Sequence, residues 1–259
     1  PPTLLRRQRQ MCIRDSPFTK VDLENFGEAM ESVSEIDDRI NGIDAVIHQA
    51  AIPASGLETN HKTFRANTLS TYNIFQASKV MKINNIVWAS SETVLGLPFD
   101  TYPPYVPVDE EYDPRPESSY SLSKVMGEEM ARQYCRRNPE MKIFGLRYSN
   151  IMEEKDYKQF QSFQKDPFLR KWNFWGYIDA RDVAQACLLA MESKLKGADN
   201  FIIAADDTVM EEDNKLLLDK VFPNIQIKGE IGKNKTLLSN EKAKKILGFK
   251  PEYSWKNIN

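Results

Sequence analysis

The fold is decided by the stretch Asn85-Ile-Val-Trp-Ala-Ser90, a short apolar run that ends in small polar residues. Such a run predicts a buried strand. A helical pattern precedes it over residues 67–81, and another follows over residues 119–138 and leads into the apolar run Lys142-Ile-Phe-Gly-Leu-Arg-Tyr148. Because helices alternate with apolar strands, the sequence predicts an α/β fold whose parallel sheet is covered on both faces.

The same alternation continues on both sides of this core. Upstream, residues 23–40 carry apolar side chains at helical spacing up to Gly42, and residues 44–48 predict a strand. Downstream, residues 179–191 predict a helix and residues 200–204 a strand. The carboxyl ends of parallel strands share one edge of the sheet, where ligands bind. We therefore expect residues 48–52, 90–93 and 148–151 to line one crevice.

Two segments depart from this alternation. Residues 93–118 form a proline-rich loop that is too long for a simple connection, and we expect it to wall the crevice. Beyond Asn150 the periodic pattern weakens, and aromatic residues gather over residues 160–175. We interpret these aromatic residues as the core of a small cap more than as a substrate platform.

Composition excludes several classes of protein. The 259 residues include 41% hydrophobic and 28% charged side chains with a formal charge of −2, which favours a soluble enzyme over a nucleic-acid-binding protein. No apolar run approaches the length of a membrane span, and no secretory signal is recognised, so we expect a cytoplasmic protein without a membrane partner. The cysteines (Cys12, Cys135, Cys187) and histidines (His48, His61) are too few and scattered for a disulfide scaffold or a zinc site. We expect no metal.

Tyr120 and Lys124 are four residues apart near the start of a predicted helix, so both side chains share one helix face. A phenol is a weak base at neutral pH, but a nearby ammonium lowers its pKa. Tyr120 is therefore a candidate general base. About thirty residues earlier, Ser91 follows a predicted strand and would present its hydroxyl to the same crevice. Alternatively, Ser91 is only a helix cap or a strand terminus. For the neighbouring Ser90 we expect a supporting role toward the backbone or the cofactor.

These motifs resemble the extended short-chain dehydrogenase/reductase family, which includes NAD-dependent sugar epimerases and dehydratases. The resemblance covers residues 22 to about 255. Its segments are Asp22-Leu23, His48-Gln-Ala-Ala51, Asn67 with Thr71, Ser90-Ser91, Tyr120 with Lys124, Leu146-Arg-Tyr-Ser-Asn150, Tyr177-Ile-Asp-Ala-Arg-Asp-Val-Ala184 and the closing run from Ser239 to Pro251. The ordered agreement of so many segments makes the resemblance specific.

The resemblance implies a Rossmann-like, doubly wound sheet that binds NAD or NADP, with NAD favoured, and a small C-terminal substrate cap. It implies that Tyr120 is the catalytic base, that Lys124 lowers its pKa and holds the nicotinamide ribose, and that Ser91 orients the substrate. Implied cofactor-binding residues are Asp22, Leu23, Ala50, Ala51, Ile52, Asn67, Ser90, Tyr120, Lys124 and Tyr148. Implied substrate-binding residues are Ser91, Glu92, Tyr120 and Asn150.

The resemblance also suggests a division of the chain. Residues 17–150 and 177–205 would form the cofactor-binding domain, and residues 151–176 and 206–259 a small substrate-binding region. Alternatively, Asp22 only ends a strand, Asn67 only bonds backbone near a helix start, and Asn150 is a turn residue. A homodimer that pairs through the helices over residues 67–81 and 119–138 is in keeping with the family.

The beginning of the chain departs from the family pattern. Residues 6–15 match the translation of a sequencing adapter, so we interpret residues 1–16 as a leader foreign to the natural protein. The family's first strand and glycine-rich phosphate-binding turn would precede Pro17. We therefore expect this chain, as a truncated copy, to bind the cofactor weakly or not at all and to be inactive. The strand over residues 44–48 would then be an unprotected edge.

Within the family, several functions stay open. The first is an NAD(P)-dependent sugar or sugar-acid oxidoreductase or epimerase, and parts of the sequence are similar to uronate dehydrogenases. A redox-neutral nucleotide-sugar dehydratase or epimerase is the second, with Glu92 as the extra carboxylate unless its side chain points to solvent. A reductase of small ketones and a non-catalytic NAD(P)-sensing or interaction protein are further alternatives. Leu95, where relatives commonly carry tyrosine, would reshape the sugar pocket.

Overall fold

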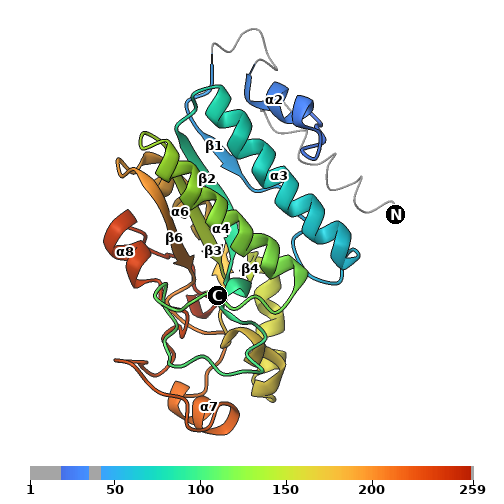
Figure 1. The fold of residues 1–259 in the computed structure, drawn as a ribbon. Coiled ribbons are helices and arrows are strands. Elements are labelled where there is room, and N and C mark those ends of the chain that lie inside the picture. The colour runs from blue at the N-terminus through green and yellow to red at the C-terminus, as the bar shows by residue number, and fades with distance from the viewer. Residues whose placement is uncertain (1–18, 35–41, 258–259) are drawn as a thin grey trace.

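A computed structural model of the chain describes residues 19–34 and 42–257 (Figure 1). The leader expected over residues 1–16 and the predicted helical positions Ile36 and Ile40 lie outside the described residues. Within the described part, the element order alternates helices and strands as the sequence predicts.

The centre of the molecule is a four-stranded parallel sheet. Its strands are β1 (Val46–His48), β2 (Asn85–Ser91), β3 (Lys142–Tyr148) and β6 (Gly197–Ile203), arranged in the order β1-β2-β3-β6. All neighbouring pairs are parallel, and the register places Ile86 of β2 between Val46 and Ile143. This confirms the α/β class and the parallel sheet. Among the described strands, β1 lies at one edge.

Helices cover both faces of this sheet because β2 turns alternate side chains to opposite sides. Ile86 and Trp88 pack in a cluster with α3 (Asn60–Val80) and α4 (Ser119–Arg137). Val87 packs in the opposite cluster with α6 (Ala180–Glu192) and α8 (Glu241–Leu247). A further helix, α2 (Phe26–Ser34), packs against α3 (Figure 1). The doubly wound arrangement predicted from the resemblance is confirmed.

A third apolar cluster lies in the smaller region, by which we mean residues 151–176 and 206–259. It joins the proline-rich loop, through Phe99 and Val106, to the aromatic residues Phe174 and Trp175 and to Phe222. Its elements are short: β4 (Ile151–Met152), α5 (Phe160–Phe163), β5 (Ile178–Asp179), α7 (Asn214–Val221) and 3₁₀ turns over Glu92–Leu95, Glu154–Gln159, Pro167–Asn173 and Trp255–Asn257. Most of the aromatic run is therefore core, although Phe168 is half exposed.

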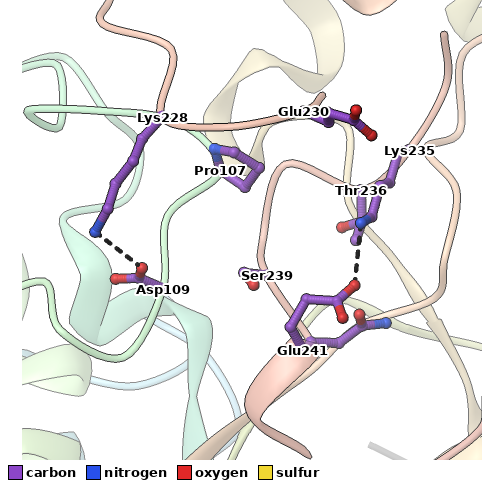
Figure 2. Close-up of a pocket in the computed structure, with 9 residues that line it drawn as sticks. Pro107, Asp109, Lys228, Glu230, Lys235, Thr236, Ser239 and Glu241 are labelled. Carbon is purple, nitrogen blue, oxygen red and sulfur yellow. Dashed lines mark ion pairs between the residues drawn. The ribbon is translucent and has the colours of Figure 1, made fainter. Parts of the chain in front are cut away.

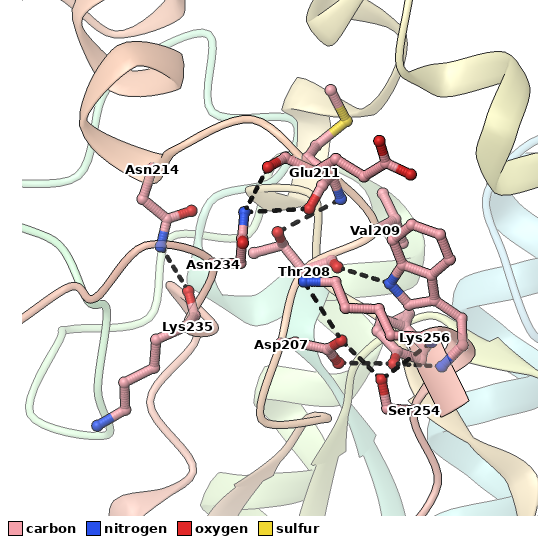
Figure 3. A network of polar contacts seen from close by, with 12 residues as sticks. Asp207, Thr208, Val209, Glu211, Asn214, Asn234, Lys235, Ser254 and Lys256 are labelled. Atoms are coloured by element: carbon pink, nitrogen blue, oxygen red, sulfur yellow. Dashed lines mark hydrogen bonds and ion pairs between the residues drawn. The ribbon is translucent and has the colours of Figure 1, made fainter. Parts of the chain in front are cut away.

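Polar contacts fasten the C-terminal segment to this smaller region (Figure 3). Asp207 accepts hydrogen bonds from the Tyr177 hydroxyl at 2.6 Å and from the Ser254 hydroxyl at 2.8 Å. The Trp255 indole donates to the Thr208 carbonyl at 2.9 Å. Asn234 donates to three successive carbonyls, those of residues 210–212. The segment over residues 206–257 is thus held by hydrogen bonds between partly buried polar groups as well as by apolar packing.

Element boundaries differ from the sequence predictions at a few places. Helix α3 begins at Asn60, seven residues before the predicted start, because the Thr59 side chain caps it by accepting from the Lys62 N–H. Strand β6 begins at Gly197, three residues earlier than predicted, while β1 starts two residues later, at Val46. The start of α4 and both ends of β3 agree with prediction.

Candidate functional site

Two neighbouring pockets share Ala51, and together their linings include all the predicted catalytic, cofactor-binding and substrate-binding residues. The larger, of about 690 Å³, lies at the carboxyl ends of β2 and β3. Predicted site residues lining it are Ala51, Ser90, Ser91, Glu92, Tyr120, Lys124, Tyr148 and Asn150. The smaller, of about 440 Å³, is lined by Asp22, Leu23, Ala50, Ala51, Ile52 and Asn67. The crevice expected at this sheet edge is present, although His48 is buried outside the lining.

The first two turns of α4 place Tyr120 and Lys124 in the larger pocket. Ser118 and Ser121 form a reciprocal capping box, in which each hydroxyl accepts from the other's N–H at 3.1 and 2.9 Å. This fixes the helix start, and Lys124 follows Tyr120 one turn later with its Nζ atom 5.6 Å from the phenol ring centroid. The Lys124 ammonium donates to the Ala89 carbonyl at 2.7 Å. Burial lowers the pKa of Lys124 to about 8.

The pKa of Tyr120 differs from the sequence expectation. Burial raises it above its ordinary value and the nearby Glu92 raises it further, while hydrogen bonding by Ser91 lowers it. The predicted lowering by Lys124 is not seen, because the ammonium is directed to the Ala89 carbonyl. In the protein alone, Tyr120 is therefore a neutral phenol at physiological pH.

Ser91 serves both roles that the sequence left open. Its Oγ accepts from the Thr93 N–H at 3.2 Å and from the Thr93 hydroxyl at 3.0 Å, so it caps the 3₁₀ turn over Glu92–Leu95. It also lines the larger pocket beside Tyr120. The structure thus places a hydroxyl and a phenol together on one wall.

Ser90 lines the same pocket but bonds to the protein interior. Its hydroxyl donates to Glu128 at 2.6 Å, and Glu128 forms a buried bidentate ion pair with Arg147 at 2.8 and 2.9 Å. The pair joins α4 to β3 below the pocket. The hydroxyl of Ser90 thus bonds a side chain, whereas the sequence predicted that it would support the backbone or a cofactor.

Glu92 is fully buried and does not point to solvent. Ser149 donates to one carboxyl oxygen at 2.7 Å, and the Asn173 amide donates to the other at 3.2 Å. Burial raises the pKa of Glu92 to about 7 despite these bonds. The carboxyl group is therefore poised to change charge near neutral pH.

Asn150 belongs to the same cluster. Its side-chain oxygen accepts from Arg170 at 2.9 Å, and Arg170 also donates to the Gly176 carbonyl at 2.8 Å. The guanidinium stacks 4.9 Å from the Trp172 ring centroid, and Trp172 lines the pocket. Asn150 is thus held by the smaller region and is more than a turn residue.

Tyr148 contacts two side chains that were not among the predicted site residues. Its hydroxyl accepts from the Gln49 amide at 3.1 Å and lies 3.1 Å from the Cys187 sulfur. Burial and the neighbouring thiol hold the pKa of Tyr148 well above its ordinary value. The phenol therefore acts as a neutral hydrogen-bonding group at the pocket wall.

In the smaller pocket, Asn67 holds the chain just after β1. Its amide group accepts from the Ile52 N–H at 2.8 Å and donates to the Ile52 carbonyl at 3.0 Å. These are hydrogen bonds to the backbone, as in the alternative that Asn67 only bonds backbone. Asn67 lies, however, in the second turn of α3 and not at the helix start. Asp22 belongs to a turn, and its carboxylate accepts from the Glu24 N–H at 2.9 Å.

Sequence reasoning missed the residues that brace the site. Asn73 of α3 donates to the Leu23 carbonyl at 2.8 Å and so fixes the wall of the smaller pocket. Ser149, Arg170 and Asn173 brace Glu92 and Asn150. The sequence did offer a signal for Ser149, because this residue lies inside the motif over residues 146–150. Leu95, expected to reshape the sugar pocket, is instead buried in the core and does not line the pocket.

A third pocket, of about 240 Å³, lies apart from these residues (Figure 2). It is formed between the loop around Pro107 and the segment over residues 228–241. Its lysines are paired within it, Lys228 with Asp109 at 3.5 Å and Lys235 with Glu241 at 3.0 Å. None of the predicted site residues lines it.

Residues 19–34 and 42–257 bear on two further kinds of site. No group of three or more histidine, cysteine, aspartate or glutamate side chains there is arranged to hold a metal ion. No helix in that part of the chain is long and apolar enough to cross a membrane.

Comparison of the chain with known proteins identifies its family, and the relatives that match include sugar epimerases and dehydrogenases. The model of the NAD dependent epimerase/dehydratase family matches residues 3–204. A putative UDP-glucose 4-epimerase of Methanocaldococcus jannaschii is 36% identical over 131 residues, which is 47% of this chain and 39% of that protein. The L-arabinose 1-dehydrogenase (NAD(P)(+)) of Haloferax volcanii is 25% identical over 74% of this chain and 80% of that protein.

A solved structure shares the fold. UDP-glucose 4-epimerase from Bifidobacterium longum, in complex with NAD+ and UDP, has a TM-score of 0.66 and 20% identity, with 99% of this chain and 84% of that chain covered. The chain spans less than half the length of the first UDP-glucose 4-epimerases that it matches.

Proposed function

The chain belongs to the NAD-dependent epimerase/dehydratase family, and on that premise we propose that it is an NAD(P)-dependent sugar oxidoreductase or epimerase that works through Ser91, Tyr120 and Lys124. One observation carries the proposal. These three side chains come from two distant segments and line one pocket, beside a second pocket that continues past Ala51. An extended dinucleotide needs such a continuous pair of cavities at the carboxyl edge of a parallel sheet.

The residues fit the two ends of such a cofactor. Lys124 is buried, and its ammonium has three N–H donors, of which the Ala89 carbonyl takes one. The others are available to ribose hydroxyls, and Tyr148 and Ala51 would border the nicotinamide. Asp22, Leu23, Ala50, Ile52 and Asn67 would border the adenosine. When bound, the nicotinamide supplies hydride transfer, and its oxidised ring carries positive charge.

The chain's own residues supply proton transfer and position. Ser91 Oγ hydrogen-bonds the reacting sugar oxygen, and Tyr120 Oη takes or returns the proton of that oxygen. Burial makes Tyr120 a weak acid in the protein alone, so positive charge beside it is needed before it ionises. Lys124 lies one helical turn away with its Nζ atom 5.6 Å from the phenol ring centroid, but it does not lower the pKa of Tyr120 by itself. Ionisation of Tyr120 is thereby coupled to filling of the pocket.

The proposal assigns roles to the two parts of the chain. Residues 17–150 and 177–205 hold the cofactor, and residues 151–176 and 206–259 contact the substrate. Trp172 and Arg170 support that division, because the smaller region brings Trp172 to the pocket and Arg170 to Asn150. A dehydratase with Glu92 as a free acid fits less well, since both oxygens of that carboxyl accept hydrogen bonds from the protein.

The test compares two tyrosines of α4. In protein expressed from its complete reading frame, Tyr120→Phe should lower kcat with the preferred sugar by a factor of about 100 or more while NAD(H) binding persists, because a general acid–base group is worth that much. Tyr134→Phe is the matched control: Tyr134 lies on the same helix and bonds Gln76, outside the pocket. A Tyr120→Phe variant as active as Tyr134→Phe would leave a non-catalytic sensor as the better account.

A further inference from the structure

One aromatic side chain of the smaller region reaches the larger pocket. Of the aromatic residues over residues 160–175, all of which the structure describes, Trp172 alone lines that cavity. Phe174 and Trp175 are fully buried in the core of the smaller region, and Phe168 is half exposed outside the pocket lining. Trp172 itself is only partly buried. Its indole is therefore a wall of the cavity as well as part of the packing.

Two hydrogen bonds hold the backbone around Trp172 against the pocket. On one side of it, Arg170 donates to the Asn150 side-chain oxygen at 2.9 Å. On the other side, the Asn173 amide donates to Glu92 at 3.2 Å, and that glutamate directly follows the proposed catalytic serine. Because these bonds flank Trp172 closely in the chain, the indole has little freedom to move away from the catalytic end of the cavity.

The turn that carries Trp172 is also locked by its own contacts. The Trp175 indole donates to the Pro167 carbonyl at 2.7 Å and so joins the end of the segment to its first residue. Phe174 and Trp175 have φ angles of 51° and 57°, which non-glycine residues keep only where surrounding contacts hold them. The Arg170 guanidinium lies 4.9 Å from the centroid of the Trp172 ring. A ligand that covers so rigid a surface orders few additional groups.

The lining of the pocket matches the two kinds of surface that a cyclic sugar has. The edge of a sugar ring carries hydroxyl groups, and polar lining residues such as Ser55, Ser91 and Asn150 can hydrogen-bond to them. A face of the ring carries C–H groups, and the indole of Trp172 offers an apolar plane. Neither contact depends on the charge of the sugar, so free sugars, sugar acids and nucleotide sugars can all use this plane.

From this placement we propose that Trp172 is the sugar-stacking residue of the larger pocket: the C–H face of the sugar ring lies against its indole while Ser91 and Tyr120 hold the reacting oxygen. The inference rests on the proposed function and deepens it, because it assigns the residue that binds the ring. The stacking contact is the same before and during proton transfer. It therefore lowers KM and leaves kcat nearly unchanged.

Steady-state kinetics of three variants test the contact, with protein from its complete reading frame. The sugars are L-arabinose, D-glucuronate and UDP-glucose, followed by reduced nicotinamide or, for UDP-glucose, also by the UDP-galactose formed. Each variant is measured with the sugar that the wild type turns over best. Trp172→Ala should raise KM about tenfold, the equivalent of about 1.4 kcal/mol, and change kcat by less than about threefold. Trp172→Phe, which keeps an aromatic face, should stay within about threefold of the wild type in both constants. Phe168→Ala is the matched control on the same turn and should equal the wild type.

Tryptophan fluorescence gives a second readout that a merely structural role would not change. The other three tryptophans lie away from the larger pocket, since Trp88 and Trp175 are fully buried and Trp255 lines a different cavity. In NAD-saturated Tyr120→Phe protein, sugar binds without appreciable turnover and should change the tryptophan emission. Adding Trp172→Phe to this variant should abolish the change.

Each result decides the assignment. An unchanged KM for Trp172→Ala, or a sugar-dependent emission change that persists after Trp172→Phe, would overturn this inference and leave the proposed function standing. A loss of kcat in Trp172→Ala that Trp172→Phe does not restore would show a structural role and would overturn it as well. No product from any of the three sugars, although the wild type binds NAD, would overturn the proposed function together with this inference.

Discussion

Glu92 is the residue whose chemistry depends most on its surroundings. Its carboxyl group is enclosed by Ser149 and Asn173, and burial raises its pKa from 4.5 to about 7. A raised pKa means that the folded protein binds a proton more tightly than the unfolded chain does. The stabilisation is complete below pH 4.5 and is lost as the pH rises through about 7.

The Glu92→Gln variant should remove this pH dependence. Between about pH 4.5 and pH 8, the free energy of unfolding of the wild type should fall relative to that of the variant by on the order of 3 kcal/mol. Denaturant unfolding across this pH range measures the difference. Glu111→Gln, at an exposed position, should follow the wild type. Parallel curves for wild type and Glu92→Gln would contradict the account of a buried, proton-binding carboxyl.

Sequence patterns predicted the site at the residue scale where chemistry is local. Tyr120 and Lys124 are one helical turn apart, and Ser91 ends a strand, so the sequence alone indicated that the three side chains share a pocket. Asn173 and Arg170 carry no such local pattern. They reach Glu92 and Asn150 only because the smaller region folds back over the sheet edge, and that contact spans about eighty residues of sequence for Asn173 and Glu92.

Among the elements, β3 and α6 are joined by Lys142. This lysine is buried at the start of β3, and its ammonium donates to the carbonyls of Ala190, Met191 and Ser193 at 2.7 to 2.8 Å. The last carbonyls of a helix lack intrahelical partners, and a cation is favoured there. Burial lowers the pKa of Lys142. One side chain thus ends the helix and anchors it to the sheet.

Lys142→Met should destabilise the protein by about 3 kcal/mol, because three buried carbonyls lose a charged donor. Lys196→Met is the matched control, since Lys196 precedes the neighbouring strand and pairs with Glu140 at the surface. It should change stability by no more than about 0.5 kcal/mol. Thermal unfolding of both variants decides the point, and equal melting temperatures would contradict the anchoring role.

Element types were predictable because each has a clear hydrophobic period, whereas several ends were not. The start of α3 at Asn60 depends on the Thr59 cap, which is a single polar contact in a segment without apolar periodicity. Lys142 at the start of β3 and the cap residue Ser118 before α4 likewise act through side chains that no hydrophobic period reveals. Propensity locates a helix, and tertiary polar contacts decide where it ends.

For the whole molecule, one exposed surface remains to be explained. Helices α3 and α4 pack side by side, and they expose the apolar residues Tyr72, Val80, Met81, Leu122 and Met126. The homodimer expected from the resemblance would cover this surface. Light scattering should therefore report a dimer for the wild type and a monomer for Leu122→Glu/Met126→Glu. Leu216→Glu on α7, also exposed, should stay dimeric. A monomeric wild type would contradict the proposed dimer.

The central claim concerns the two joined pockets and the hydride chemistry proposed for them. The most direct measurement mixes protein from its complete reading frame, loaded with NAD, with a sub-stoichiometric amount of the preferred sugar and follows the near-ultraviolet absorbance of reduced nicotinamide. The account predicts that the absorbance rises within a single turnover, for a dehydrogenase and an epimerase alike, and that Tyr120→Phe slows the rise by about 100-fold. NAD-loaded protein that binds sugar without any rise would contradict the account.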